Sequence, residues 1–272
     1  MVAGHIVATT GEPVRYAPRS LFSFAAAAFM AVSLSSPASA EGPPTPCSEQ
    51  RETVRLGNAL PRVATRLAAG EAVTIVAIGS SSTAGAGAST SAAAYPSRLA
   101  VELQAQFPGR SIRVVNRGVN GEEAQQMVAR FDTDVFPEKP DLVLWQVGTN
   151  SLLRDRPLAQ AEPFIREGVR RLKSGGTDVI LVDPQFAPRV ISKPDVAKLV
   201  EMLSAVAKEE NIGVFHRFAA MRHWREVQNI AFTTFVPPDE LHMNDWSYSC
   251  IGKLFASSIN EAISRSLLTA TR

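Results

Sequence analysis

The chain of 272 residues is long enough for one α/β domain together with a targeting segment, and its 45% hydrophobic residues suffice for a sizeable core. Its net charge of +2 is close to neutral, and no run of basic residues interleaved with aromatic ones occurs. These features argue against a protein that binds nucleic acid.

The first forty residues have the pattern of a secretory signal peptide. Two arginines precede an alanine-rich apolar stretch over 21–34, and the small residues Ala38 and Ala40 stand where a signal peptidase requires them, before Glu41. We predict a signal peptide over 1–40 and a periplasmic or extracellular mature protein with no stable membrane insertion. An uncleaved anchor is the alternative, although serines and a proline interrupt the end of the apolar stretch.

The two cysteines agree with export. Cys47 lies near the predicted mature start and Cys250 near the carboxyl terminus. In an oxidising compartment they can pair, and we predict that they form a disulfide. The alternative is two unrelated thiols, with Cys250 buried as a small apolar residue.

The remaining chain is predicted to be one domain over 71–272, preceded by a proline-rich linker and a helix over 41–70 in which Pro61 introduces a kink or a new start. Five apolar runs read as strands, at 74–78, 112–116, 142–147, 179–182 and 212–215. Helical patterns occur at 95–107, 122–131, 157–173, 194–210, 218–227 and 245–268. This alternation predicts a flavodoxin-like three-layer α/β/α sandwich with a five-stranded parallel sheet.

A serine cluster follows the first predicted strand directly. The stretch TIVAI over 74–78 ends at Gly79, and three serines at 80–82 come next, where open α/β sheets usually hold their ligands. One of these serines is a candidate nucleophile. The alternative is a loop that only cradles a phosphate, although the Gly-Lys-Ser/Thr ending of a nucleotide-binding loop is missing.

A serine hydroxyl needs a base, and the base needs an orienting group. PPDELH over 237–242 supplies both, because Asp239 and His242 are three residues apart in one turn. Donors for an oxyanion are offered by NRGVNG over 116–121 and by GTN over 148–150, each after a predicted strand.

The blocks GSSSTAG, NRGVNG, GTN and DELH occur in the order and context of the four blocks of the SGNH (GDSL-type) hydrolases, and the sequence resembles that family. The resemblance implies that Ser81 is the nucleophile and His242 the base, with Asp239 behind it. It assigns the oxyanion hole to the backbone N–H groups of Ser81 and Gly121 and to the Asn150 side-chain amide. No metal-binding motif occurs, and no cofactor is expected.

Two positions depart from the family's pattern. Ser80 stands where many members have an aspartate, so that any support this carboxylate gives to the oxyanion segment must come from a hydroxyl here. Ser151 stands where GTN often continues with aspartate. Ser80 and Ser82 remain alternative nucleophiles, and Asp183, which follows the fourth strand, is expected to be structural rather than to bind substrate.

The resulting hypothesis is a secreted serine esterase that hydrolyses carboxylic esters through an acyl-Ser81 intermediate. Export favours a small-molecule or glycan ester as substrate, with a short acyl group such as acetyl on a carbohydrate as the first expectation by analogy. Two alternatives stay open: an O-acyltransferase with the same triad, and a non-catalytic glycan-binding module of the same fold. The sequence does not predict the oligomeric state.

Overall fold

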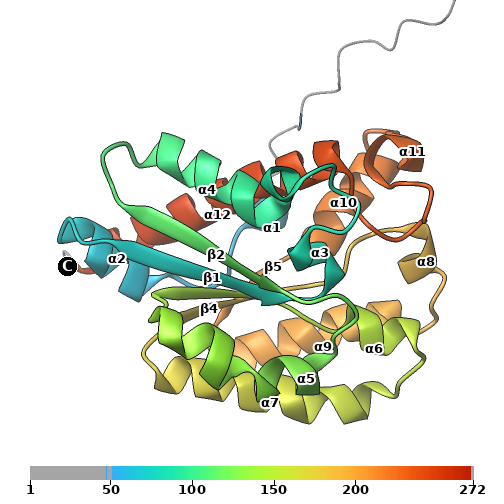
Figure 1. Cartoon of the computed structure of the whole chain (residues 1–272), viewed down its shortest axis with the longest axis horizontal. Coiled ribbons are helices and arrows are strands. Elements are labelled where there is room, and N and C mark those ends of the chain that lie inside the picture. The colour runs from blue at the N-terminus through green and yellow to red at the C-terminus, as the bar shows by residue number, and fades with distance from the viewer. Residues whose placement is uncertain (1–46, 48–50, 271–272) are drawn as a thin grey trace, which may run out of the picture. The chain divides into compact units, whose positions relative to one another are not determined.

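Figure 1 shows a central sheet between two layers of helices. The computed structural model describes Cys47 and residues 51–270, which belong to one compact unit over 44–272. The predicted signal peptide over 1–40 lies outside the described residues, as does most of the linker, so both stay predictions. None of the described helices is both long enough and apolar enough to cross a membrane.

The sheet has five strands, all of them parallel, in the order β2-β1-β3-β4-β5. The strands are β1 (Val73–Gly79), β2 (Ile112–Gly118), β3 (Leu142–Gln146), β4 (Asp178–Val182) and β5 (Gly213–Phe215). Every side chain of β3 and almost every one of β1 and β4 is buried, as expected for strands covered on both faces. The predicted flavodoxin-like sandwich is confirmed.

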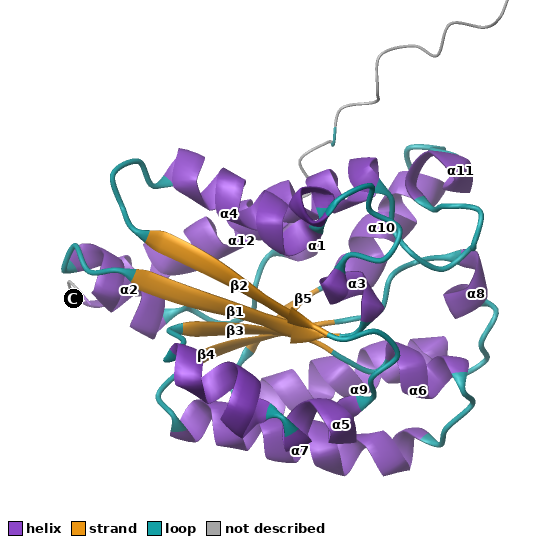
Figure 2. Ribbon diagram, viewed as in Figure 1, coloured by secondary structure: helices purple, strands orange, loops and turns teal. Residues whose placement is uncertain are grey.

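Helices α1, α4 and α12 lie on one side of the sheet, and α5, α7 and α9 lie on the other (Figure 2). The larger helices are α2 (Pro61–Ala68), α4 (Tyr95–Gln106), α5 (Ala124–Ala129), α7 (Leu158–Ser174), α9 (Val196–Glu209), α10 (Arg217–Glu226) and α12 (Asp245–Ala270). The short ones are α1 (Arg51–Val54), α3 (Ser81–Ala84), α6 (Thr149–Leu153), α8 (Pro188–Ile191) and α11 (Phe232–Phe235). The sequence patterns did not predict the short helices, because these are too short to carry a repeating apolar spacing.

The helix expected before the first strand is divided into two. Residues 55–60 are not helical, and Pro61 begins α2, where its missing N–H is no disadvantage. Leu56 and Leu60 are each 1% exposed although neither lies in a helix. The new start expected at Pro61 is therefore observed, whereas the apolar spacing over 55–60 reflects burial of a connecting segment and not a helix.

The predicted disulfide is confirmed: Cys47 is bonded to Cys250, with 5.4 Å between their Cα atoms. Cys250 lies in the second turn of α12 and is fully buried. The bond therefore attaches the segment that precedes α1 to the carboxyl-terminal helix across 203 residues of sequence.

Candidate active site

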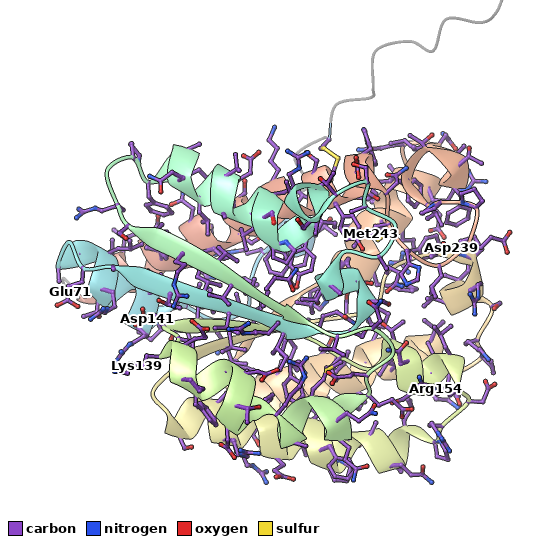
Figure 3. All side chains as sticks on the ribbon, viewed as in Figure 1. Glu71, Lys139, Asp141, Arg154, Asp239 and Met243 are labelled. Atoms are coloured by element: carbon purple, nitrogen blue, oxygen red, sulfur yellow. A yellow bond between two sulfur atoms is a disulfide. The ribbon has the colours of Figure 1, made fainter. Side chains whose placement is uncertain are left out.

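The carboxyl ends of the strands carry most of the predicted site. Asp239 and Arg154 lie at the edge towards which the strands point, whereas Glu71 and Asp141 lie at the opposite edge (Figure 3). Loops that follow parallel strands are gathered at one edge of such a sheet, so segments distant in sequence meet there.

Ser81 is the first residue of α3, two residues after β1 ends at Gly79. A backbone N–H in the first turn of a helix has no carbonyl to bond within that helix, so the Ser81 N–H has no such partner. Gly118, at the end of β2, allows α3 to approach closely, because a Cβ atom there would lie 2.1 Å from the Ala84 nitrogen. The chain thus turns sharply and holds the Ser81 hydroxyl at the sheet edge.

The structure brings Ser81, His242 and Asp239 together in one hydrogen-bonded chain. His242 Nε2 lies 2.9 Å from Ser81 Oγ, and His242 Nδ1 lies 2.5 Å from Asp239 Oδ2. Since an ionised carboxylate only accepts hydrogen bonds, Nδ1 carries the proton and Nε2 accepts the serine hydroxyl. This is the arrangement that a serine nucleophile requires of its base.

The carboxylate of Asp239 is kept ionised by its neighbours. Partial burial raises its pKa, but the His242 ring and the backbone N–H groups of Leu241 and His242 donate to it, and the pKa lies below its ordinary value. Both N–H groups bond to Asp239 Oδ1 at 3.0 Å, which leaves Oδ2 for the imidazole. The negative charge that holds the histidine tautomer is therefore present across the neutral range.

Gln185 connects the turn that carries His242 to the core. Its amide nitrogen donates to the Leu241 carbonyl at 3.0 Å, and its oxygen accepts from Arg217 Nη2 at 3.0 Å. Arg217 is fully buried, and its Nε donates to the Asp183 carbonyl. Burial lowers the pKa of the Arg217 guanidinium, although the Asp183 charge opposes the change.

Gly121 follows β2 and Asn150 lies in α6, after β3, so both come from the connections that follow the two strands flanking β1. The Val119 N–H donates to the Gly79 carbonyl at 3.0 Å, which ties the segment before Gly121 to the end of β1. Gly121 has a φ of +79°, a conformation that favours glycine. Asn150 donates one amide hydrogen to the Glu122 carbonyl at 2.8 Å, and the amide has a second hydrogen for another acceptor.

Ser80, which replaces the family's usual aspartate, is 2% exposed. Its N–H and its hydroxyl both donate to Gln146 Oε1 at 2.9 Å. In the part of the chain that the structure describes, this hydroxyl has no hydrogen bond to the 116–121 segment. Ser80 therefore joins β1 to β3, and the expected hydroxyl support of the oxyanion segment is not observed.

Asn116 supports that segment instead. Its amide donates to the Thr83 carbonyl at 2.8 Å and its oxygen accepts from the Gly118 N–H at 2.9 Å. Asn116, Gln146 and Gln185 make these supporting hydrogen bonds, and none of the three was predicted to do so. Gln146 is the last residue of β3, Gln185 comes three residues after β4, and Asn116 lies two residues before the end of β2, so polar residues near strand ends were the signal in the sequence.

Asp183 is structural, as expected. It is 1% exposed, and its Oδ1 accepts the Phe218 N–H at 2.8 Å, in the first turn of α10. Its Oδ2 lies 3.4 Å from His216 Nδ1.

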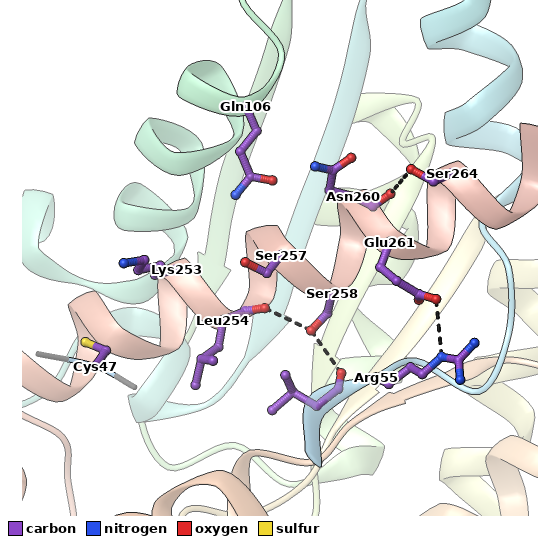
Figure 4. Close-up of a pocket in the computed structure, with 11 residues that line it drawn as sticks. Cys47, Arg55, Gln106, Lys253, Leu254, Ser257, Ser258, Asn260, Glu261 and Ser264 are labelled. Atoms are coloured by element: carbon purple, nitrogen blue, oxygen red, sulfur yellow. Dashed lines mark hydrogen bonds and ion pairs between the residues drawn. The ribbon is translucent and has the colours of Figure 1, made fainter. Parts of the chain in front are cut away.

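A hollow of about 700 Å³ lies between α1, α4 and α12, away from Ser81 (Figure 4). Its lining includes Arg55, Gln106 and Glu261 and none of the predicted site residues. Among residues 47 and 51–270, no group of three His, Cys, Asp or Glu side chains is arranged to hold a metal ion.

A family model described as the non-GDSL lipase-like family matches residues 46–265 of this chain. The chain belongs to this family. The expected membership of the SGNH (GDSL-type) hydrolases is confirmed.

Two curated esterases are similar to parts of the chain. An acetylxylan esterase of Geobacillus stearothermophilus is 40% identical over 65 residues, 24% of this chain and 28% of that protein. Esterase TesA of Pseudomonas aeruginosa is 31% identical over 127 residues, 44% of this chain and 60% of that protein. The matched segments thus span less than two thirds of either relative.

Solved structures share the fold at low identity. A two-domain esterase active on acetylated mannans, crystallised with mannopentaose, has a TM-score of 0.69 and 20% identity over 80% of this chain and 58% of its own. The acetylxylan esterase of Geobacillus stearothermophilus has a TM-score of 0.59 and 21% identity, over 69% of this chain and 94% of its own.

Proposed function

We propose that this protein is a carboxylic ester hydrolase that removes acetyl groups from a carbohydrate through an acyl-Ser81 intermediate. The observation that carries the proposal is the hydrogen-bonded chain from Ser81 through His242 to Asp239, at 2.9 and 2.5 Å. Membership of a lipase-like family supports ester hydrolysis as the reaction.

The reaction divides into two steps. His242 Nε2 takes the hydroxyl proton while Ser81 Oγ bonds to the ester carbonyl carbon, and the oxyanion that forms is held by the Ser81 and Gly121 N–H groups and the Asn150 amide. The carbon–oxygen bond to the alcohol then breaks, and His242 returns the proton to the departing oxygen. Water repeats the sequence on the acyl-enzyme, which releases the acid and restores Ser81.

The proposed acetylated carbohydrate rests on the relatives. The Geobacillus enzyme is an acetylxylan esterase, and the two-domain esterase is active on acetylated mannans. We extend this substrate class to the present chain as the working hypothesis. Acyl transfer to a sugar hydroxyl would use the same triad. It differs from hydrolysis in its product, which is an acylated sugar and not a free acid.

Export to an oxidising compartment is part of the proposal. The Cys47–Cys250 disulfide supports it, because such bonds persist mainly in secreted and periplasmic proteins. We assign the activity to a domain over 71–272, after a signal peptide over 1–40 and a linker and helix over 41–70.

The test compares acetyl and octanoyl p-nitrophenyl esters and then acetylated xylo- and manno-oligosaccharides, with the protein that begins at Glu41. We expect a higher kcat/KM for the acetyl ester and release of free acetate from at least one oligosaccharide. A marked preference for the octanoyl ester contradicts the acetyl assignment. Appearance of an acylated acceptor sugar in place of acetate indicates a transferase, and glycan binding without turnover indicates a non-catalytic module.

A further inference from the structure

Three consecutive residues beside the proposed oxyanion hole are held by side chains from one short helix and the residue after it. Asn150 Nδ2 donates to the Glu122 carbonyl at 2.8 Å, as described above. Arg154 Nη2 donates to the Gly121 carbonyl at 2.9 Å, and its Nη1 to Glu123 Oε1 at 2.6 Å. Ser151 Oγ donates to Glu123 Oε2 at 3.0 Å.

The spacing of these side chains explains how they reach one segment. Asn150 and Arg154 are four residues apart, so they project from the same face of α6. A guanidinium group presents its donors as a rigid planar fork, which allows Arg154 to bond a carbonyl and a carboxylate at once. Arg154 lies at the edge of the sheet where the strands end (Figure 3).

We call the hydrogen bonds from Asn150, Ser151 and Arg154 to residues 121–123 the clamp. The segment 121–123 is also fixed at its carboxyl end. Glu123 is the N-cap of α5, where its carboxylate accepts from the Gln126 backbone and the Gln126 side chain bonds the Glu123 N–H. Gly121 itself has no Cβ atom to restrict it, and its φ of +79° is one of several conformations that glycine adopts readily. The hydrogen bonds to its carbonyl and to the next two residues therefore restrict the backbone on the carboxyl side of its N–H.

We propose that Arg154 is a positioning residue, which with Glu123 fixes the Gly121 N–H and the Asn150 amide in the directions that an oxyanion requires. The inference rests on the proposed ester hydrolysis. Arg154 acts through Gly121 and Asn150, and misplacing donors by a fraction of an ångström weakens the stabilisation of the transition state.

A serine at position 151 is compatible with these contacts, whereas an aspartate is not. The family often has an aspartate at this position, but here the hydroxyl donates to Glu123, which already carries a negative charge. An aspartate at 151 would place a second carboxylate about 3 Å from the first, where like charges repel strongly. Ser151→Asp therefore disrupts the clamp, whereas Ser151→Ala removes a single hydrogen bond.

The experiment measures kcat, KM and melting temperature for Arg154→Ala and Arg154→Lys with p-nitrophenyl acetate. Arg170→Ala is the matched control, since Arg170 also forms one exposed ion pair, to Glu210 at 2.9 Å, away from the site. We expect kcat to fall 10- to 100-fold in Arg154→Ala with KM changed less than twofold and the melting temperature close to that of the control. Partial recovery is expected in Arg154→Lys and on adding millimolar guanidinium to Arg154→Ala.

A second readout does not depend on activity. Hydrogen exchange of the backbone amides over 118–124 should be faster in Arg154→Ala than in Arg170→Ala. Unchanged exchange overturns the clamp whether or not the wild type hydrolyses esters. A further outcome combines faster exchange in Arg154→Ala with a wild type that shows no Ser81-dependent hydrolysis. That combination overturns both the proposed function and the catalytic role of the clamp.

One kinetic result would assign Arg154 another role. Arg154 also lines a polar cavity of about 550 Å³ with Arg156, Gln125 and Gln160. If KM rises in Arg154→Ala while kcat stays at the control value, Arg154 binds substrate in that cavity and the positioning role is overturned.

Discussion

Asp178 makes the stability of this protein depend on pH in a direction unusual for a carboxylate. It begins β4, partly buried next to α2, at the edge of the sheet opposite Ser81. Burial raises its pKa from 3.8 to about 6, although the Val63 and Arg62 backbone N–H groups and the Arg62 charge act in the opposite direction. The nearby Asp141 charge raises the pKa further.

The direction in which the free energy of unfolding changes with pH follows from the pKa values of Asp178 in the folded and unfolded chains. Below about pH 4 the carboxyl group is protonated in both folded and unfolded chains, and its contribution to stability is fully present. Between about pH 4 and pH 6 the unfolded chain loses the proton more readily, so that this contribution is lost as pH rises. A shift of about 2 pKa units corresponds to about 3 kcal/mol of lost free energy of unfolding above pH 6.

Asp178→Asn removes the ionisation but keeps an oxygen that can accept the Val63 N–H. We expect its free energy of unfolding, relative to that of the wild type, to be about 3 kcal/mol higher at pH 7.5 than at pH 3.5, so that the variant is the more stable protein at the higher pH. Urea unfolding at the two pH values measures the difference, with the exposed Asp132→Asn as control. If the stability difference between variant and wild type is the same at both pH values within about 0.5 kcal/mol, the Asp178 carboxyl does not destabilise the fold when it ionises.

Three further variants test the structure and the site. Ser80→Asp, which restores the family's residue, should lower the free energy of unfolding by about 1–3 kcal/mol in urea titrations, because the new carboxylate faces Gln146 Oε1; unchanged stability contradicts this contact. Replacing Cys47 and Cys250 by serine should lower it by up to about 5 kcal/mol, since the closed loop is long; thermal unfolding at the wild-type temperature counts against that. Asn150→Ala should reduce kcat for p-nitrophenyl acetate by about 100- to 1,000-fold; a loss confined to KM opposes the oxyanion role.

The fold was predictable because the strands are short apolar runs separated by helical patterns with clear boundaries. Val73–Gly79 and Leu142–Gln146 are buried on both faces, and such strands are recognised in a sequence as continuous apolar stretches. The connection over 55–60 was not predictable, because Leu56 and Leu60 are buried by tertiary packing that has no local periodicity.

The residues of the proposed triad were predictable because each stands in a short ordered block. The supporting contacts were not, because they join segments far apart in sequence. Arg154 reaches Gly121 across 33 residues, and Gln185 reaches Leu241 across 56. A polar residue after a strand can be noticed in the sequence, but its partner depends on how the loops meet in space.

The identity of the nucleophile is the central claim, and covalent labelling tests it most directly. The protein would be treated with a fluorophosphonate, digested, and the modified residue located by mass spectrometry, with Ser81→Ala and His242→Ala in parallel. We expect one label, on Ser81. In Ser81→Ala both the label and ester hydrolysis should be lost, and in His242→Ala the label should form far more slowly. A label on Ser80 or Ser82, or wild-type hydrolysis by Ser81→Ala, would contradict this claim.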